Sequence, residues 1–164
     1  MAYSGIRYGE GLNVVPVLAP VDQGAAGTDV SSYVDLRRAN WLTFLVMLGA
    51  MTSDASDTVT FVVDCSTDGS TTGAACAFKY RLSAAVGTNT WGAITDSTSD
   101  GAAIVGATDD NKSILIDVDP AVVRAAKTGA NWARLEATNV GPISLISVCA
   151  FTETMYPGNT IRTT

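Results

Sequence analysis

Hydrophobic and polar residues alternate along most of the chain after residue 33, with the period of two expected of strands that bury one face. Residues 58–65 show this most clearly, because an apolar side chain stands at every second position. Residues 76–82 repeat the pattern, and an Asp-Gly pair at residues 68–69 favours a turn between the two segments. We therefore expect these segments to form a hairpin.

The segment 41–48 is different because it is apolar on both faces. A strand with this pattern is expected in the centre of a sheet, with other structure covering it on each side. Further strands are predicted at residues 113–118, 132–138 and 143–152. Residues 84–110 are rich in Gly, Thr, Ser and Asp, and we expect long loops there with one or two short strands.

One short helix is predicted between residues 119 and 129. Asp119 suits the N-cap, Pro120 suits the first helical position, and Gly129 suits the residue that stops the helix. About two turns fit between these signals, so the helix is expected to be a connector.

The first 30 residues show no helical period, and glycine and proline recur through them. The segment nevertheless carries Tyr3, Ile6, Tyr8 and Leu12, which makes it too apolar for a solvated tail. A dozen extended residues reach about 40 Å. We therefore predict that residues 1–30 form an extended N-terminal arm that docks on its own domain or on a neighbour.

These elements predict an all-β protein with a single β-sandwich domain at residues 31–153 and a short C-terminal tail at residues 154–164. The pattern leaves open whether the strand order is that of a jelly roll or is immunoglobulin-like. A partly closed barrel is a weaker alternative. The length of 164 residues fits one such domain.

Charged residues make up only 16% of the chain, against a usual share of about 25%, and the formal net charge is −6. Much of the surface must therefore consist of Ser, Thr, Ala and Gly, and it is either sparsely solubilised or partly covered by partners. We expect no nucleic-acid partner, because phosphate binding needs clustered Lys and Arg. We also expect no membrane partner, since the longest apolar stretch, residues 41–51, is shorter than the roughly 20 residues of a membrane span.

The candidate chemistry is limited because the chain contains no histidine. This excludes Ser-His-Asp and Cys-His arrangements and the HExxH zinc site. Residues 64–70 match the first half of a calcium-binding loop, but Ala75 stands where a bidentate Glu is needed, so a hairpin loop explains them better. We predict no catalytic, cofactor-binding or metal-ligating residues, and we expect that the protein is not an enzyme.

The three cysteines, Cys65, Cys76 and Cys149, each lie within an apolar, strand-like run and form no CxxC pair. We expect them to be small buried hydrophobic residues of a protein that folds in a reducing compartment. No signal peptide is recognisable in the first residues, which fits synthesis in the cytoplasm.

Eight residues are candidates for a partner interface. Trp132 falls on the polar side of its strand and Trp91 lies in a Gly- and Thr-rich loop, so each is either an interface anchor or packed against neighbouring loops. The other candidates are apolar residues of the arm and the tail: Tyr3, Ile6, Tyr8, Leu12, Met155 and Tyr156.

Several segments, taken in order, resemble a known group of proteins. They are the apolar run 14–21, the segment Tyr33-Val34-Asp35-Leu36-Arg37-Arg38-Ala39-Asn40-Trp41, the strand-like runs 58–63 and 77–82, and the closing segments 132–139 and 150–157. This order resembles small virion structural proteins of tailed bacteriophages, particularly those that decorate or cement the capsid. The resemblance implies a β-sandwich that assembles as a homo-oligomer, a dimer or a trimer, on the outer capsid surface and bridges major capsid proteins. It assigns no functional residues and implies no cofactor.

We therefore expect a capsid decoration or cement protein that is made in the host cytoplasm and located on the virion. It would stabilise the capsid by burying surface and through contacts of its arm. Two alternatives stay open. One is a head–tail connector or tail structural protein, and the other is a glycan-binding module for host attachment, in which Trp91 and Trp132 would be exposed.

Overall fold

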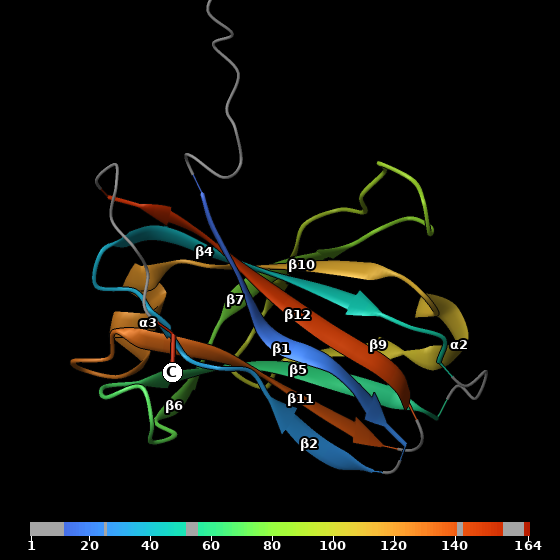
Figure 1. Ribbon diagram of the computed structural model, residues 1–164, viewed down its shortest axis with the longest axis horizontal. Coiled ribbons are helices and arrows are strands. Elements are labelled where there is room, and N and C mark those ends of the chain that lie inside the picture. The colour runs from blue at the N-terminus through green and yellow to red at the C-terminus, as the bar shows by residue number, and fades with distance from the viewer. Residues whose placement is uncertain (1–11, 25, 52–55, 141–142, 156–162) are drawn as a thin grey trace, which may run out of the picture.

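The computed structural model describes residues 12–24, 26–51, 56–140, 143–155 and 163–164, which form a single β-sandwich of two antiparallel sheets (Figure 1). The predicted all-β sandwich is therefore confirmed. Both sheets end in edge strands, so the described part of the chain does not close into a barrel.

Two six-stranded sheets, called sheet A and sheet B, make up the sandwich. Across sheet A the strands are β1 (Asn13–Gln23), β12 (Ile143–Thr154), β4 (Ala39–Leu48), β10 (Ser113–Val118), β7 (Phe78–Leu82) and β8 (Thr95–Ser97). Across sheet B they are β2 (Gly27–Val30), β11 (Trp132–Val140), β5 (Thr58–Ser66) and β6 (Ala74–Cys76). In addition, β3 (Val34–Asp35) pairs with β11, and β9 (Ala102–Val105) pairs with β5.

The strands pass between the sheets in the order of a jelly roll. β1, β4, β10 and β12 lie side by side in sheet A, whereas β2, β5 and β11, which alternate with them along the chain, lie in sheet B. β6 and β9 share the last row of sheet B, because they pair with successive parts of β5. This arrangement is the jelly-roll order and not the immunoglobulin order, which resolves the alternative that the sequence left open. The β7–β8 hairpin extends sheet A beyond β10.

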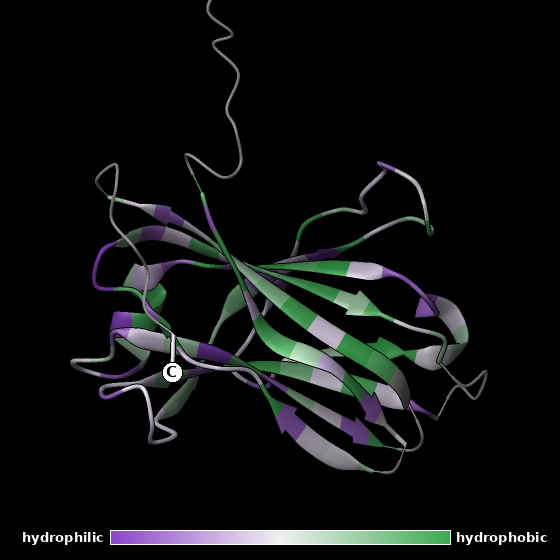
Figure 2. Cartoon of the chain, in the orientation of Figure 1, coloured by the Kyte–Doolittle hydropathy of each residue, from purple (hydrophilic) through white to green (hydrophobic). Residues whose placement is uncertain are grey.

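The core lies between the inner faces of the two sheets. The alternation of β5 places Val59, Phe61 and Val63 in this core with no exposed surface, and Phe44 and Ile116 from sheet A are equally buried. Figure 2 shows β1 and β12 coloured hydrophobic over much of their length, whereas β2 has neutral and hydrophilic colours.

Two short helices are described, α2 (Gly106–Asp109) and α3 (Pro120–Ala126). α3 begins as predicted, because the Asp119 carboxylate accepts a hydrogen bond of 2.7 Å from the backbone N–H of Ala121. Gly129 follows the helix with a φ of 82°, a conformation that favours glycine. The prediction of a single helix missed α2, although the two short strands expected in the same loop-rich region are present as β8 and β9.

The predicted hairpin between residues 58–65 and 76–82 is only half right. β6 does pair with β5, but β7 lies in the other sheet and pairs with β10. The chain changes sheets at Ala77, and the alternation continues through this residue because Cys76 and Phe78 both point into the core. The sequence therefore contains no signal for the change.

The segment predicted as an extended arm, residues 1–30, contains two strands of the sandwich. β1 pairs with β12 at the edge of sheet A, and β2 pairs with β11 in sheet B, so both segments are strands of the sandwich. Residues 1–11 lie outside the described residues. The tail also begins slightly later than predicted, since β12 includes Thr154, and the last residue docks on the domain through a hydrogen bond of 3.1 Å from the Thr164 N–H to the Tyr33 carbonyl.

Candidate interaction face

β4 leaves one of its two apolar sides exposed. Leu42, Phe44 and Val46 point into the core and are fully buried, whereas Trp41 and Met47 on the other side are 38% and 43% exposed. The described part of the chain thus covers this strand on one side only. The prediction of a central strand is confirmed, since β4 lies between β12 and β10, but the described residues do not supply the cover expected on its second side.

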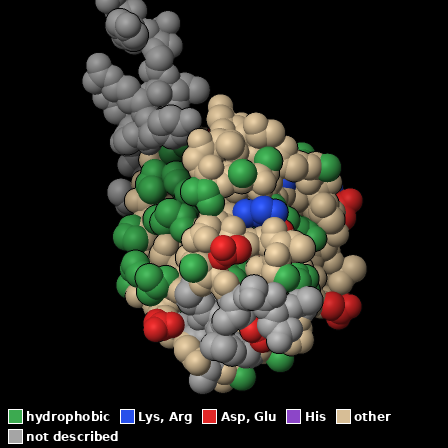
Figure 3. Space-filling model, turned by 90° about the vertical axis from the view of Figure 1, so that its right-hand side faces the viewer, with side chains coloured by type: hydrophobic (Ala, Val, Ile, Leu, Met, Phe, Trp, Pro, Cys, Tyr) green, Lys and Arg blue, Asp and Glu red, His purple; other side chains and the backbone are tan. Residues whose placement is uncertain are grey.

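Neighbouring strands continue this apolar surface, because antiparallel pairing places opposite residues on the same side of a sheet. Val14 and Leu145, from β1 and β12, are 46% and 52% exposed. We call this surface the apolar face; its residues are Val14, Trp41, Leu45, Met47, Leu115, Leu145, Cys149 and Phe151. Figure 3 shows hydrophobic side chains gathered along one side of the molecule and only a few scattered charged side chains. Connected apolar surface of this kind marks interaction sites on soluble proteins.

One end of the apolar face is hollowed. The hollow has a volume of about 430 Å³, and its apolar walls include Leu12, Trp41, Trp91, Leu115 and Phe151. Three charged side chains also line it, namely Arg81, Asp117 and Glu153. We call it the aromatic hollow. A volume in this range, with a mostly apolar wall and a few polar groups, is typical of a binding site.

Backbone pairing at the end of β7 holds Trp91 in the hollow. Ser83 and Trp91 form an isolated β-bridge, and the N–H of Gly92 donates to the carbonyl of Leu82 at 2.8 Å. The guanidinium of Arg81 lies 5.5 Å from the centroid of the Trp91 ring, which is a cation–π contact.

The polar groups of the hollow differ in whether they have hydrogen-bond partners. One carboxylate oxygen of Asp117 accepts hydrogen bonds from the Thr43 hydroxyl at 2.6 Å and from the Trp41 indole N–H at 3.4 Å. The Nε–H of Arg81, in contrast, is buried and has no acceptor in the part of the chain that the structure describes. A buried donor without a partner is unfavourable by about 1–3 kcal/mol. Arg81 therefore has hydrogen-bonding capacity that the described fold does not use.

A second depression of about 320 Å³ is also bordered by Trp41, and three carboxylates line it. Each carboxylate already has a partner: Asp117 accepts from Thr43, Asp119 caps α3, and Asp96 pairs with Lys79. Within the described ranges, no three His, Cys, Asp or Glu side chains are grouped so that they could hold a metal ion.

The eight predicted interface residues lie in different environments or outside the described residues. Leu12 and Trp91 meet in the aromatic hollow, and Met155 is 42% exposed at the end of β12. Tyr3, Ile6, Tyr8 and Tyr156 lie outside the described residues. The sequence did not reveal Trp41 and Phe151 as surface residues, since an apolar strand face looks the same whether the fold or a partner covers it.

Among the described residues, no helix is both long and apolar enough to cross a membrane. Comparisons with protein-family models, with curated proteins and with solved structures find no match for this chain.

Trp132 is buried and therefore does not serve as an exposed interface anchor. Only 6% of its surface is accessible, because the loop after β5 and the guanidinium of Arg37, 5.6 Å from the ring centroid, cover it. The alternation argument placed this side chain on the correct, outer side of sheet B. The expectation that it packs against a neighbouring loop is the one that holds.

Gly69 makes this packing possible, and its replacement is a test of it. Gly69 and Gly87 both have positive φ values, of 74° and 71°. A Cβ on Gly69 would lie 2.8 Å from the Trp132 ring, whereas one on Gly87 would meet nothing within 4 Å. We expect Gly87→Ala to lower the free energy of unfolding by about 1–2 kcal/mol from backbone strain alone. Gly69→Ala should cause the same strain and lose about 1–3 kcal/mol more, because its Cβ clashes with the Trp132 ring. Urea denaturation of both variants measures the difference, and equal losses would contradict the proposed packing.

The loop that covers Trp132 is stabilised by hydrogen bonds to a carboxylate of its own, that of Asp68. Asp68 accepts hydrogen bonds of 2.9 Å from the backbone N–H groups of Ser70 and Thr71, and these bonds hold the pKa of its carboxyl well below the usual range. The segment 64–70, which matched part of a calcium-binding loop, thus forms the end of β5 and the first part of the hairpin loop between β5 and β6, in agreement with the hairpin explanation.

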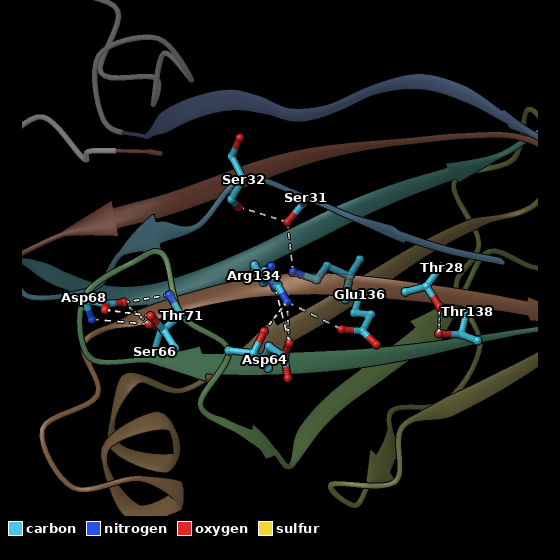
Figure 4. A network of polar contacts seen from close by, with 12 residues as sticks. Thr28, Ser31, Ser32, Asp64, Ser66, Asp68, Thr71, Arg134, Glu136 and Thr138 are labelled. Atoms are coloured by element: carbon cyan, nitrogen blue, oxygen red, sulfur yellow. Dashed lines mark hydrogen bonds and ion pairs between the residues drawn. The ribbon is translucent and has the colours of Figure 1, made fainter.

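A network of polar side chains on the outer side of sheet B is internally paired (Figure 4), although Val30 and Val140 are exposed at the ends of β2 and β11. Arg134 donates to the Asp64 carboxylate at 3.1 Å and to the Thr72 hydroxyl at 2.8 Å, and its guanidinium lies 4.8 Å from the centroid of the Tyr33 ring. Glu136 is the next acidic side chain, 3.8 Å from Arg134. Since Arg134 and the carboxylates satisfy one another, the apolar face of sheet A, which the described residues leave exposed, is the better candidate for a functional surface.

Glu136 should make stability depend on pH. Burial, followed by the negative charge of Asp64, raises the pKa of its carboxyl in the folded protein, and Arg134 only partly opposes this. The folded state therefore loses stability as the pH rises from the unfolded pKa of about 4.3 through the higher folded pKa. We expect Glu136→Gln to stabilise the protein at pH 7 relative to the parent, and this gain should disappear near pH 4. Urea denaturation between pH 4 and 8 tests this, with Glu153→Gln on the exposed rim as the control; a gain that does not vary with pH would contradict it.

Proposed function

We propose that this protein is a structural component of a tailed-bacteriophage virion that binds the outer capsid surface and cements the lattice of the major capsid protein. The observation that carries the proposal is the apolar face, an exposed surface on four adjacent strands of sheet A. In this proposal the protein acts by binding and not as an enzyme.

The physical basis is burial of apolar area against a partner. Each square ångström of apolar surface removed from water contributes about 25 cal/mol, and a stable interface buries about 800 Å² on each partner. Trp41, Met47 and Leu145 are large and exposed, so they are suited to be the centre of such an interface. A protein that binds only the assembled lattice stabilises the lattice by mass action.

Composition and architecture support the same proposal. A charged share of 16% leaves few groups to keep the apolar face soluble alone. Jelly rolls are common in viral capsid proteins and in lectins, although a fold by itself does not determine a function. The partner in this proposal, the major capsid protein, and the assembly of several copies are what the sequence resemblance to capsid decoration proteins implies.

A pair of double variants tests the proposal. Met47→Asp with Leu145→Asp places two charges on the apolar face, while Val86→Asp with Ile94→Asp makes the same change in the loop between β7 and β8, where both residues are more than 60% exposed. We expect the first variant to lose binding to capsids assembled without this protein, and the control to bind like the parent, as measured by co-sedimentation and particle imaging. Unchanged capsid binding by the folded first variant would contradict the proposal.

A glycan-binding function is a second candidate, favoured by the aromatic hollow. Trp41 and Trp91 offer ring faces, and Arg81, Asp117 and Glu153 offer hydrogen-bonding groups beside them. Only part of the expected arrangement is present, since Trp132 is buried. A specific hit on a glycan array that is lost in Trp91→Ala would support this function, and an array without hits would remove it.

A further inference from the structure

The aromatic hollow and the second depression meet at one pair of side chains. Trp41 and Asp117 line both of them, and the Trp41 indole N–H donates to Asp117 Oδ1 at 3.4 Å. This pair is therefore the border between the two. We infer that the two together form one groove, which binds an uncharged oligosaccharide chain laid across the border. The inference rests on the glycan-binding candidate for the aromatic hollow and extends it to a ligand longer than one sugar ring.

The groove crosses five adjacent strands of sheet A, in the order β8, β7, β10, β4 and β12. One lining residue from each strand stands in a continuous row of cross-strand pairs: Asp96, Lys79, Asp117, Thr43 and Phe151. Four strand spacings amount to about 19 Å. This distance is longer than one sugar ring and suits a chain of several.

Two tryptophan rings supply the apolar surface on which sugar rings stack. Trp41 is 38% exposed at the border, and Trp91 is half-buried in the wall of the aromatic hollow. A pyranose ring has an apolar face of C–H groups that packs on an aromatic ring, whereas its hydroxyl groups need hydrogen bonds. The border offers both kinds of contact, since the Asp117 carboxylate lies beside the Trp41 ring.

The polar groups of the groove can satisfy the hydroxyl groups of such a chain. The buried Nε–H of Arg81, which has no acceptor among the described residues, would donate to a ligand hydroxyl. Both hydrogen bonds to Asp117 described above end on Oδ1, and a carboxylate has about four acceptor positions, so Oδ2 can accept from a hydroxyl. Lys79 and Asp96 are 56% and 80% exposed, so they can exchange their weak ion pair for contacts with a ligand.

Charge selects among the saccharides that would fit. Negative side chains outnumber positive ones in the lining of the groove, with Asp96, Asp117, Asp119 and Glu153 against Lys79 and Arg81. A sialylated chain would add further negative charge and bind more weakly. A nucleic acid is disfavoured for the same reason. An uncharged chain meets no such repulsion.

A glycan array followed by an NMR titration of the full-length protein tests the inference. The array carries uncharged and sialylated chains, each in several lengths. We expect hits among the uncharged chains, with an affinity about tenfold higher for the longer chain than for its single sugar, because the longer chain adds hydrogen bonds. The best hit should shift the indole N–H resonances of Trp41 and Trp91 but not that of Trp132, which is buried.

Asp96→Ala tests whether both hollows are used. Asp96 lines the second depression and not the aromatic hollow, and its exposure means that the variant should fold like the parent. We expect the variant to bind the longer chain about tenfold more weakly and the single sugar as the parent does. Asp22→Ala is the control, because this exposed carboxylate lies near the end of β1 that is remote from the groove, and it should bind both ligands like the parent.

Equal affinity for the longer chain and the single sugar would overturn the inference, and so would undiminished binding of the longer chain by Asp96→Ala. The glycan-binding candidate would then stand for the aromatic hollow alone. A preference for sialylated chains, or a hit that leaves the Trp41 resonance unshifted, would overturn the inference as well. An array without hits would remove the glycan-binding candidate and the inference together. The capsid-binding proposal is tested separately, because Met47 and Leu145 line neither hollow.

Discussion

Replacing Arg134 with Met is expected to lower the free energy of unfolding by about 3–5 kcal/mol, because the Asp64 carboxylate then stays buried without its ion pair. Both side chains lie on sheet B and are only 14% and 7% exposed, with 3.1 Å between the guanidinium nitrogen and the carboxylate oxygen. Methionine is similar in length but supplies neither the charge nor the hydrogen bonds. Urea denaturation at neutral pH measures the loss.

Lys79→Met is the matched control for this prediction. Lys79 and Asp96 also form an ion pair, but their side chains are 56% and 80% exposed. Solvent screens such a pair, so the variant should change the stability by less than about 1 kcal/mol. Similar losses in the two variants would show that burial does not decide the strength of the Arg134–Asp64 pair.

Phe61→Ala is expected to lower the free energy of unfolding by a similar amount, about 3–5 kcal/mol, because it opens a cavity in the core. Phe61 on β5 has no exposed surface, and its partners across the sheet are Ala102 and Ala137. Side chains as small as these cannot move in to fill the space that the ring leaves. Guanidinium denaturation gives the loss as a change in midpoint at constant slope.

The same substitution on the outer side of sheet A provides the comparison. Phe151 is only partly buried in the wall of the aromatic hollow. Phe151→Ala should therefore reduce stability by only about 1 kcal/mol. A loss as large as that of Phe61→Ala would mean that the apolar face is covered in the free protein by more than the described residues.

The comparison of these two phenylalanines bears on function. The two sheets share one core, but sheet B pairs its outer polar groups with one another, whereas sheet A exposes apolar side chains. An outer side that adds little to folding stability yet remains apolar is more readily explained by a partner than by the fold.

Local sequence signals proved sufficient for individual elements. Three features could be predicted because each depends on residues that are close in the chain: the alternation of β5, the Asp119 cap and the glycine stop of α3. The outward direction of Trp132 could be predicted for the same reason. The residues that cover Trp132 could not be predicted, since the loop around Gly69 and the side chain of Arg37 come from other strand connections.

The sequence by itself determined that this chain is an all-β sandwich with few charges, because period-two alternation and composition depend on no long-range contact. Tertiary structure alone decided the jelly-roll order, the change of sheets at Ala77 and the place of residues 13–23 and 27–30 as strands. It also decided that the described residues leave the outer side of β4 uncovered. These properties depend on which strands pair across large separations in the chain, and an alternating pattern is identical for either sheet and for either a covered or an open face.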